Sequence, residues 1–176
     1  MLFRSLYFSI VVQSQDLLSQ AKSERLFKSG IDLMEHAEFG AARETFANFL
    51  LQAPQRDLKR GDAEYYKAFC SLNLYHADGE KLIENFISEN GHHPKAATAY
   101  YDLGNFFYNE KNYVRASAYF AKTDFISLSP EQQNSGRFRG GYSLFNQKRI
   151  KEALDEFNFI KSQGGQIGRA SCRERV

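Results

Sequence analysis

The sequence predicts an all-α fold built from paired antiparallel helices, and three observations support this. Apolar residues recur at helical spacing along most of the chain between residues 22 and 165. Short polar turns separate successive apolar stripes, so consecutive helices must fold back on each other. Pro54, Pro94 and Pro130 lie 40 and 36 residues apart, and an interval of this size indicates a repeated unit.

The first two helix pairs are expected at about 22–56 and 62–94. The stripes of the first pair are Leu26, Gly30 and Leu33, followed by Phe39, Ala42 and Phe46. The stripes of the second pair are Tyr66, Phe69 and Cys70, followed by Leu82 and Phe86. Leu82 stands where the first pair has the small residue Ala42. We therefore expect the two helices of the second pair to lie farther apart.

The third pair, at about 95–130, has the clearest pattern. Its stripes are Tyr100, Leu103, Gly104 and Phe107, followed after the polar turn 109–112 by Tyr113, Ala116 and Phe120. Pro94 suits the first turn of a helix, where its missing N–H is not needed. Ser129 and Gln132 predict a capping box that starts the next helix.

The fourth pair, at about 131–165, repeats the pattern less regularly. Its stripes are Gly141 and Leu144, followed by Ile150, Ala153 and Phe157. Arg137 stands where an aromatic residue is usual. The small residues Gly30, Cys70, Gly104 and Gly141 are separated by 40, 34 and 37 residues, so the same unit occurs four times.

These stripes resemble the tetratricopeptide repeat, in which small residues mark the close approach of the two helices and aromatic residues fill the spaces between hairpins. The resemblance covers about residues 22–165 and implies a right-handed α-solenoid of about four helix hairpins. The residues that it assigns to packing are Gly30, Ala42, Phe46, Cys70, Phe86, Tyr100, Leu103, Gly104, Phe107, Ala116, Phe120, Gly141, Leu144, Ala153 and Phe157.

The same resemblance implies a concave groove that holds a peptide, lined by the first helix of each hairpin. The groove candidates are Phe27, Ile31 and Met34; Lys67, Ser71 and Tyr75; Tyr101, Asn105, Tyr108 and Asn109; and Phe138, Tyr142, Phe145 and Asn146. The alternative is that several of these residues only pack between hairpins. Phe27 stands where a carboxylate-clamp repeat has its first lysine, so an adaptor for acidic chaperone tails is not expected.

Catalytic and cofactor motifs are not predicted. His92 and His93 are adjacent, so they point apart, and no further ligand follows at zinc spacing. The segment 136–141 is rich in glycine and arginine but lacks the ending of a phosphate-binding loop. Cys70 is interpreted as a small core residue. We therefore expect no enzyme activity, no metal and no cofactor.

The two ends of the chain differ from the repeats. Residues 1–14 combine Arg4 with a short apolar run and resemble a secretory signal peptide, although a packed first helical turn is the alternative. Residues 166–176 have no apolar period and resemble a translated sequencing adapter, with a genuine basic tail as the alternative. Without both ends, the net charge changes from +2 to 2 − 1 − 2 = −1.

Composition limits the remaining function classes. A chain of 176 residues with 43% hydrophobic residues is long and apolar enough for a packed core, and two cysteines exclude a disulfide framework. The groove is aromatic and amide-rich, so nucleic acid is not the expected partner. The first hypothesis is a non-enzymatic adaptor of the bacterial envelope, in the periplasm or at the outer membrane. It would bind protein or peptide segments. The export signal together with Tyr- and Phe-rich hairpins resembles the exported repeat proteins of Gram-negative bacteria of the Bacteroidetes type.

A second hypothesis is the periplasmic sensory domain of a membrane signalling protein such as a histidine kinase. An apolar run of about 20 residues downstream of position 165 in the gene would favour this sensor. Further repeats of about 34 residues without such a run would favour the adaptor.

Overall fold

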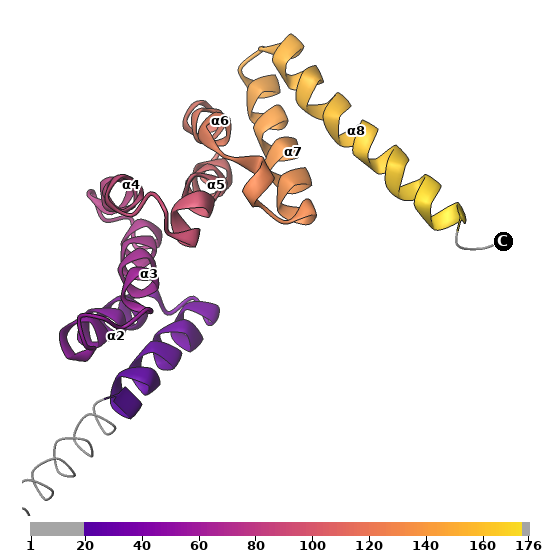
Figure 1. The fold of residues 1–176 in the computed structure, drawn as a ribbon. Coiled ribbons are helices and arrows are strands. Elements are labelled where there is room, and N and C mark those ends of the chain that lie inside the picture. The colour runs from indigo at the N-terminus through magenta and orange to yellow at the C-terminus, as the bar shows by residue number, and fades with distance from the viewer. Residues whose placement is uncertain (1–19, 174–176) are drawn as a thin grey trace, which may run out of the picture. The chain divides into compact units, whose positions relative to one another are not determined.

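The computed structural model describes residues 20–173 of the chain, and side chains from 20 to 162. Within these residues the structure is helical, with no strand (Figure 1). A first helix covers 20–35. It is followed by α2 (Phe39–Gln52), α3 (Arg60–Asn73), α4 (Gly79–Glu89), α5 (Pro94–Asn109), α6 (Tyr113–Lys122), the short 3₁₀ helix η1 (Phe125–Ser127), α7 (Pro130–Asn146) and α8 (Ile150–Arg173). The chain divides into two compact units, residues 1–90 and 91–176.

The turn inside each hairpin has the same backbone geometry. Four residues that are not glycine have a φ near +60°, and each lies two residues after the last helical residue of its hairpin's first helix: Ala37, Tyr75, Lys111 and Lys148. In the third hairpin, Asn112 N–H donates to the Phe107 carbonyl and Lys111 N–H to the Tyr108 carbonyl. This pair of bonds is a Schellman motif, and equivalent bonds close the other three turns. The turn therefore ends one helix and reverses the chain.

Small residues lie at the contact between the two helices of three hairpins. A Cβ atom added at Gly30 would lie 2.7 Å from the Phe46 ring. One at Gly104 would lie 2.8 Å from the Phe120 ring, and one at Gly141 would lie 2.8 Å from the Phe157 ring. The three contacts pair the same repeat positions, and each ring occupies the space that a larger residue would need.

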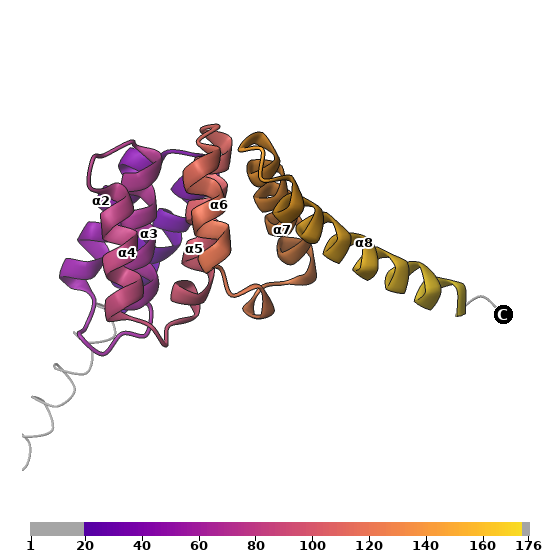
Figure 2. The same cartoon turned by 90° about the horizontal axis from the view of Figure 1, so that it is seen from above.

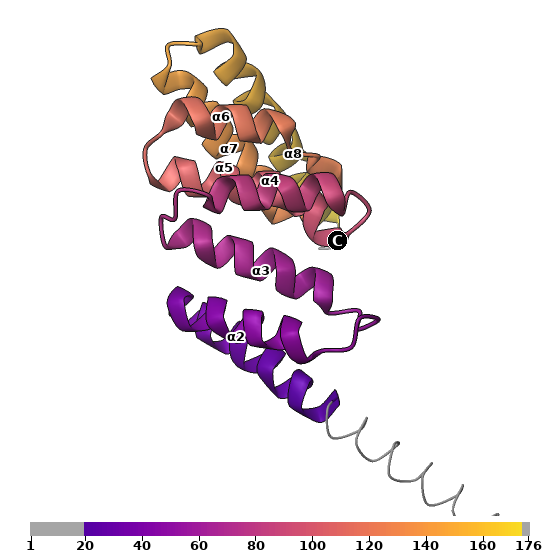
Figure 3. The ribbon, with the colours of Figure 1, turned by 90° about the vertical axis from the view of Figure 1, so that its left-hand side faces the viewer.

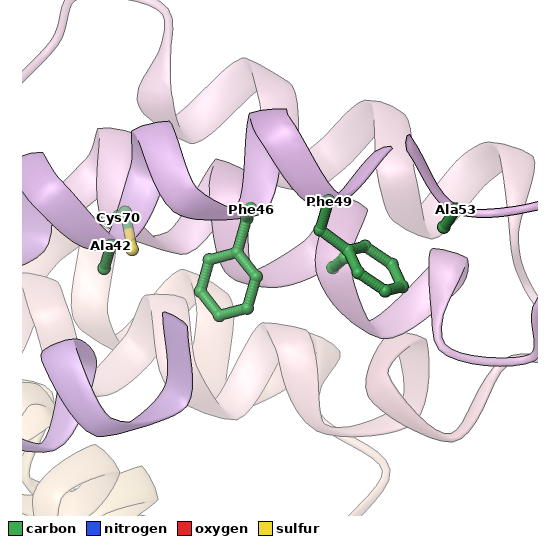
Figure 4. Packing of buried hydrophobic residues seen from close by; sticks show 6 residues of the cluster. Ala42, Phe46, Phe49, Ala53 and Cys70 are labelled. Atoms are coloured by element: carbon green, nitrogen blue, oxygen red, sulfur yellow. The ribbon is translucent and has the colours of Figure 1, made fainter. Parts of the chain in front are cut away.

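The residues assigned to packing are mostly inaccessible to solvent. All are buried except three half-buried side chains, Tyr100, Leu144 and Phe157. In the first unit, α2 packs against α3 and α3 against α4, as the successive layers in Figure 3 show. One cluster of buried residues in this unit consists of Phe46 and Phe49 (Figure 4) with smaller residues around them: Ala42, Ala53, Ala63 and Cys70.

The second hairpin has a close approach at the start of α4 that the sequence pattern did not predict. Gly79 is buried there, and an added Cβ atom would lie 2.7 Å from the Leu72 Cα atom of α3. Ile83 and Phe86 face the core, whereas Leu82 is only half-buried. The close approach thus moves to the beginning of the helix, where the sequence supplies a glycine.

In the second unit, α6 packs against both α5 and α7, and α7 packs against α8 (Figure 2). Leu103 is fully buried, and the rings of Phe107 and Tyr119 stack with centroids 5.6 Å apart. The predicted capping box at the start of α7 is confirmed, because the side chains of Ser129 and Gln132 each accept a bond from the other's backbone N–H. Pro94 lies in the first turn of α5, as predicted.

The structure describes the C-terminal end of the chain to Arg173 but not the first 19 residues. The expected signal peptide, residues 1–14, lies outside the described residues. Helix α8 continues through position 165 to Arg173, so the backbone has no break where the tail 166–176 was expected to begin. No described helix has the length and apolar character needed to cross a membrane.

Candidate protein-interaction surface

Helix α7 presents three aromatic side chains to solvent. Phe138, Tyr142 and Phe145 are 51%, 38% and 54% exposed. Their spacing of four and then three residues places them on one side of the helix. We call these three residues the α7 aromatic face. A group of exposed rings such as this one is typical of a surface that binds another molecule.

Tyr142 also belongs to a cluster of three tyrosines. Tyr108 lies near the end of α5, Tyr113 begins α6, and Tyr142 reaches them from α7. The ring centroids are 6.1 Å apart for Tyr108 and Tyr113, 5.9 Å for Tyr108 and Tyr142, and 5.8 Å for Tyr113 and Tyr142. All three pairs meet edge to face, an arrangement that aromatic rings favour. The short turn between α5 and α6 brings the first two rings together, and the packing of α7 on this hairpin adds the third.

One cation and two amides lie beside the tyrosines. Arg139 Nη1 donates to Asn105 Oδ1 at 2.7 Å, and its guanidinium carbon lies 5.6 Å from the centroid of the Tyr108 ring. Asn146 Nδ2 donates to the Tyr142 carbonyl at 2.8 Å. The set forms a rigid apolar area next to groups that bind peptide backbone and carboxylate. We call this set the tyrosine–arginine surface: Asn105, Tyr108, Tyr113, Arg139, Tyr142 and Asn146.

Two groove candidates of α5, Tyr101 and Asn109, are not part of this surface. Tyr101 is 8% exposed, its ring lies 6.3 Å from that of Phe120, and Gly136 of α7 covers it. It therefore fills space between helices. Asn109 is exposed at the end of α5. Arg139 and Tyr113 were not predicted as surface residues. Tyr108 and Tyr113 flank the polar turn, and this spacing was a signal that two rings would meet.

In the first unit, the candidates on the first helix pack against the core. Phe27, Ile31 and Met34 are partly buried there, and the Phe27 ring lies 5.4 Å from that of Phe49. The Lys59 ammonium group lies over the Phe27 ring, 5.4 Å from its centroid, and pairs with Glu24. The hydrogen bond from Lys59 lowers the pKa of the Glu24 carboxyl group below its ordinary value, and nearby Lys28 adds to the effect.

The candidates on α3 are spread over different environments. Ser71 is buried and donates to the Lys67 carbonyl, Lys67 itself is half-buried, and Tyr75 is 67% exposed at the turn. The first unit thus brings Phe27 and Ile31 together along one shallow cleft of about 300 Å³, which Glu24 and Lys59 also line. It does not place Tyr75 in that cleft.

A second cleft, of about 440 Å³, lies between α6, α7 and α8. Arg137 is at its edge, with its guanidinium carbon 4.5 Å from the Phe125 ring centroid and 3.8 Å from that of Phe159. Arg137 Nη1 also pairs with Glu156 at 2.9 Å. Arginine replaces the usual aromatic residue here because its planar group stacks between two rings. The residues of α7 that line this cleft lie on the opposite side of the helix from the α7 aromatic face.

The other sequence motifs are parts of helices or their ends. Residues 136–141 lie in the middle of α7, so their glycines serve helix packing. The His93 side chain accepts the Lys95 N–H as the N-cap of α5. Among the described residues, no group of three or more His, Cys, Asp and Glu side chains is arranged to hold a metal ion.

Comparisons with known proteins give a structural match only. No protein-family model matches the sequence, and no curated protein is significantly similar to it. A solved structure titled MamA AMB-1 aligns with a TM-score of 0.54 at 20% identity, covering 80% of this chain and 72% of that one. A mutant of MamA aligns with the same score and identity, covering 77% of its own chain. The predicted all-α class is confirmed, and the chain has the tetratricopeptide-like helical-solenoid fold of MamA.

Proposed function

We propose that this protein is a non-enzymatic scaffold that binds a peptide segment of another protein across the tyrosine–arginine surface. One observation carries the proposal: three tyrosine rings from three helices meet at solvent beside the Arg139–Asn105 pair. Helical-repeat folds of this type commonly offer extended surfaces to protein partners. The MamA-like fold is in keeping with this class of function.

The chemistry of the surface favours a particular kind of peptide. Tyrosine supplies rigid area for an apolar or aromatic side chain at small entropic cost. The Asn146 Nδ2 atom donates to the Tyr142 carbonyl within α7, and the oxygen of the same amide is chemically able to accept a backbone N–H. Arg139 lies beside the Tyr108 ring, and a charge-assisted bond from its guanidinium group favours a carboxylate. We therefore expect a peptide with one apolar residue and an acidic group close to it.

The test is peptide selection from a displayed random library, followed by measurement of the affinity of a selected peptide. Tyr108→Ala combined with Tyr142→Ala should weaken binding at least about tenfold, since buried aromatic anchors dominate interface energies. The matched control is Ile126→Ala, which removes a 92% exposed apolar side chain of the same unit and should leave the affinity unchanged. Equal affinities of the double variant and the wild type would refute the binding surface.

We also propose that the protein is exported and works in the bacterial envelope. The support is the sequence of residues 1–14, with one arginine before a short apolar run. Fusion of residues 1–30 to a reporter enzyme that is active only outside the cytoplasm should give activity in a Gram-negative host. Arg4→Glu together with Val11→Arg should abolish it. Reporter activity that persists in this variant, or never appears in the wild type, would refute export.

A further inference from the structure

The tyrosine–arginine surface has more hydrogen-bond donors than its own contacts use. The rings of Tyr108, Tyr113 and Tyr142 contact one another, but their hydroxyl groups have no hydrogen-bond partner within the part of the chain that the structure describes. Tyr108 and Tyr113 are half-buried and Tyr142 is exposed. Each hydroxyl group can therefore donate its hydrogen to a bound molecule.

The amide and guanidinium groups of this surface add further donors. Asn105 Oδ1 accepts the bond from Arg139, so the Asn105 Nδ2 atom is left to donate. Asn146 Nδ2 uses one of its two hydrogens for the Tyr142 carbonyl. The bond to Asn105 uses only one of the several N–H groups of Arg139. The surface contains no carboxylate, so it best fits a ligand that is rich in acceptors.

The backbone conformation of a peptide decides how many acceptors it offers. An α-helix uses most of its carbonyl groups internally, and would leave the donors of the surface unpaired. An extended strand offers N–H and carbonyl groups alike and pairs with the edge of a sheet, whereas the described residues form no strand. A polyproline II segment has no internal hydrogen bonds, and each of its prolines has a carbonyl group but no N–H. It is the backbone that complements a surface of donors.

We propose that the tyrosine–arginine surface binds a proline-rich segment in the polyproline II conformation, with an acidic residue that pairs with Arg139. This inference rests on the proposed function and names the class of peptide. The three tyrosine rings are inclined to one another by 65°, 71° and 73°, so they present both faces and edges to a ligand. Grooves lined by aromatic residues bind such segments in other folds, and the preformed polyproline II helix loses little entropy on binding.

The exposure of this surface follows from its place in the repeat. The third and fourth hairpins match with a constant shift of 37 residues, as the equivalent contacts of Gly104 and Gly141 show. Tyr142 therefore corresponds to Asn105. Asn105 is only half-buried, although α7 packs beside α5 and bonds to it through Arg139. A helix packed on α7 in the same way would border Tyr142 and leave the surface open.

The test compares two synthetic peptides with acetylated and amidated ends, so that neither has a terminal charge. The probe has the sequence Pro-Pro-Pro-Glu-Pro-Pro-Pro. The control has alanine in place of every proline, which keeps the length and the charge but adds backbone N–H groups and flexibility. Binding of each labelled peptide to the full chain is followed by fluorescence anisotropy. The proline peptide should bind at least about tenfold more tightly than the alanine peptide.

Variants of the protein separate the role of the rings from that of the hydroxyl groups. Tyr108→Ala combined with Tyr142→Ala should weaken binding of the proline peptide at least about tenfold. Tyr108→Phe combined with Tyr142→Phe keeps the rings and removes two donors, and should weaken binding at least about fivefold. The matched control is Tyr75→Ala, which removes a 67% exposed tyrosine of the first unit and should leave binding unchanged.

The pairing of Arg139 with the acidic residue has its own test. Arg139→Gln should weaken binding of the proline peptide, since a charge-assisted bond is lost. The same substitution should have little effect on a proline peptide whose glutamate is replaced by glutamine. An equal loss of affinity for both peptides would show that Arg139 does not bind the carboxylate.

The results distinguish this inference from the proposed function. Equal binding of the proline and alanine peptides, unchanged binding in the double phenylalanine variant, or no binding of the proline peptide at millimolar concentration would overturn the polyproline II inference. The random library tests the function itself. Selected peptides that contain no proline, and that lose affinity in the double alanine variant, would uphold the function and overturn only the inference. A library without any peptide that depends on these tyrosines would refute both.

Discussion

At the scale of single residues, Gly79 has the least room for a side chain. Its added Cβ atom would meet backbone atoms of Leu72, which cannot rotate away. We predict that Gly79→Ala lowers the free energy of unfolding by about 2 kcal/mol, since overpacking exceeds the gain in helix propensity. Gly40→Ala is the control, because no atom lies within 4 Å of its Cβ position, and it should be neutral or slightly stabilising. If urea unfolding gave the same change in stability for Gly79→Ala and Gly40→Ala, the close approach of Gly79 to Leu72 would be contradicted.

The buried thiol of Cys70 should make the free energy of unfolding depend on pH in the alkaline range. The thiol is fully buried, and burial raises its pKa from 9.0 to about 11. The unfolded state then loses its proton first, so the stabilising contribution is complete below about pH 9 and is lost as the pH rises to about 11. Two pKa units correspond to about 2.7 kcal/mol.

The check is to compare Cys70→Ala with the parent protein, both carrying Cys172→Ser. The stability difference between them should shift by about 2–3 kcal/mol between pH 8 and pH 11, because only the parent has the titrating thiol. Other groups titrate in both proteins and cancel. A constant difference across this range would show that the Cys70 thiol is not held in its neutral form.

At the scale of elements, the four hairpin turns place an ordinary side chain in the left-handed region. Lys111 has a φ of 58° and is exposed in the turn between α5 and α6. Lys111→Gly should raise the free energy of unfolding by up to about 1 kcal/mol, because glycine adopts this conformation without steric cost. Ala118→Gly, at an exposed position of α6, should lower the free energy of unfolding by about 1 kcal/mol. In thermal unfolding we expect Lys111→Gly to raise the melting temperature and Ala118→Gly to lower it.

Elements whose signals lie within a few neighbouring residues were predictable. The capping box at Ser129 and Gln132 was predicted from their spacing of three residues. The start of α5 was predicted from Pro94, whose ring suits the first turn of a helix. The left-handed turn residues were not predictable, because alanine, tyrosine and lysine occupy positions where glycine is the usual signal. The geometry arises instead from the two backbone bonds that close each turn.

At the scale of the whole molecule, the two units should respond separately to damage in their cores. Phe46→Ala should reduce amide protection most in the first helix, α2 and α3, which surround this ring. Phe120→Ala should reduce it most in α5, α6 and α7. Each substitution leaves a cavity and should cost about 3–5 kcal/mol. Hydrogen exchange resolved by peptide is the measurement, and repeat arrays predict decay of the effect with distance along the chain. Equal loss of protection in α2 and α7 would contradict this.

The helical class, the repeated small-residue positions and the capping signals were predictable from the sequence, because periodicity and caps depend on residues close together in the chain. Which side chains reach solvent was not, because it depends on how the helices pack. Tyr101 and Phe138 occupy the same repeat position, yet one is buried by α7 and the other is exposed. Arg139 and Asn105 meet across 34 residues, a pairing that no local pattern encodes. Exposure depends on what packs next to a residue, and that is a property of neighbouring helices.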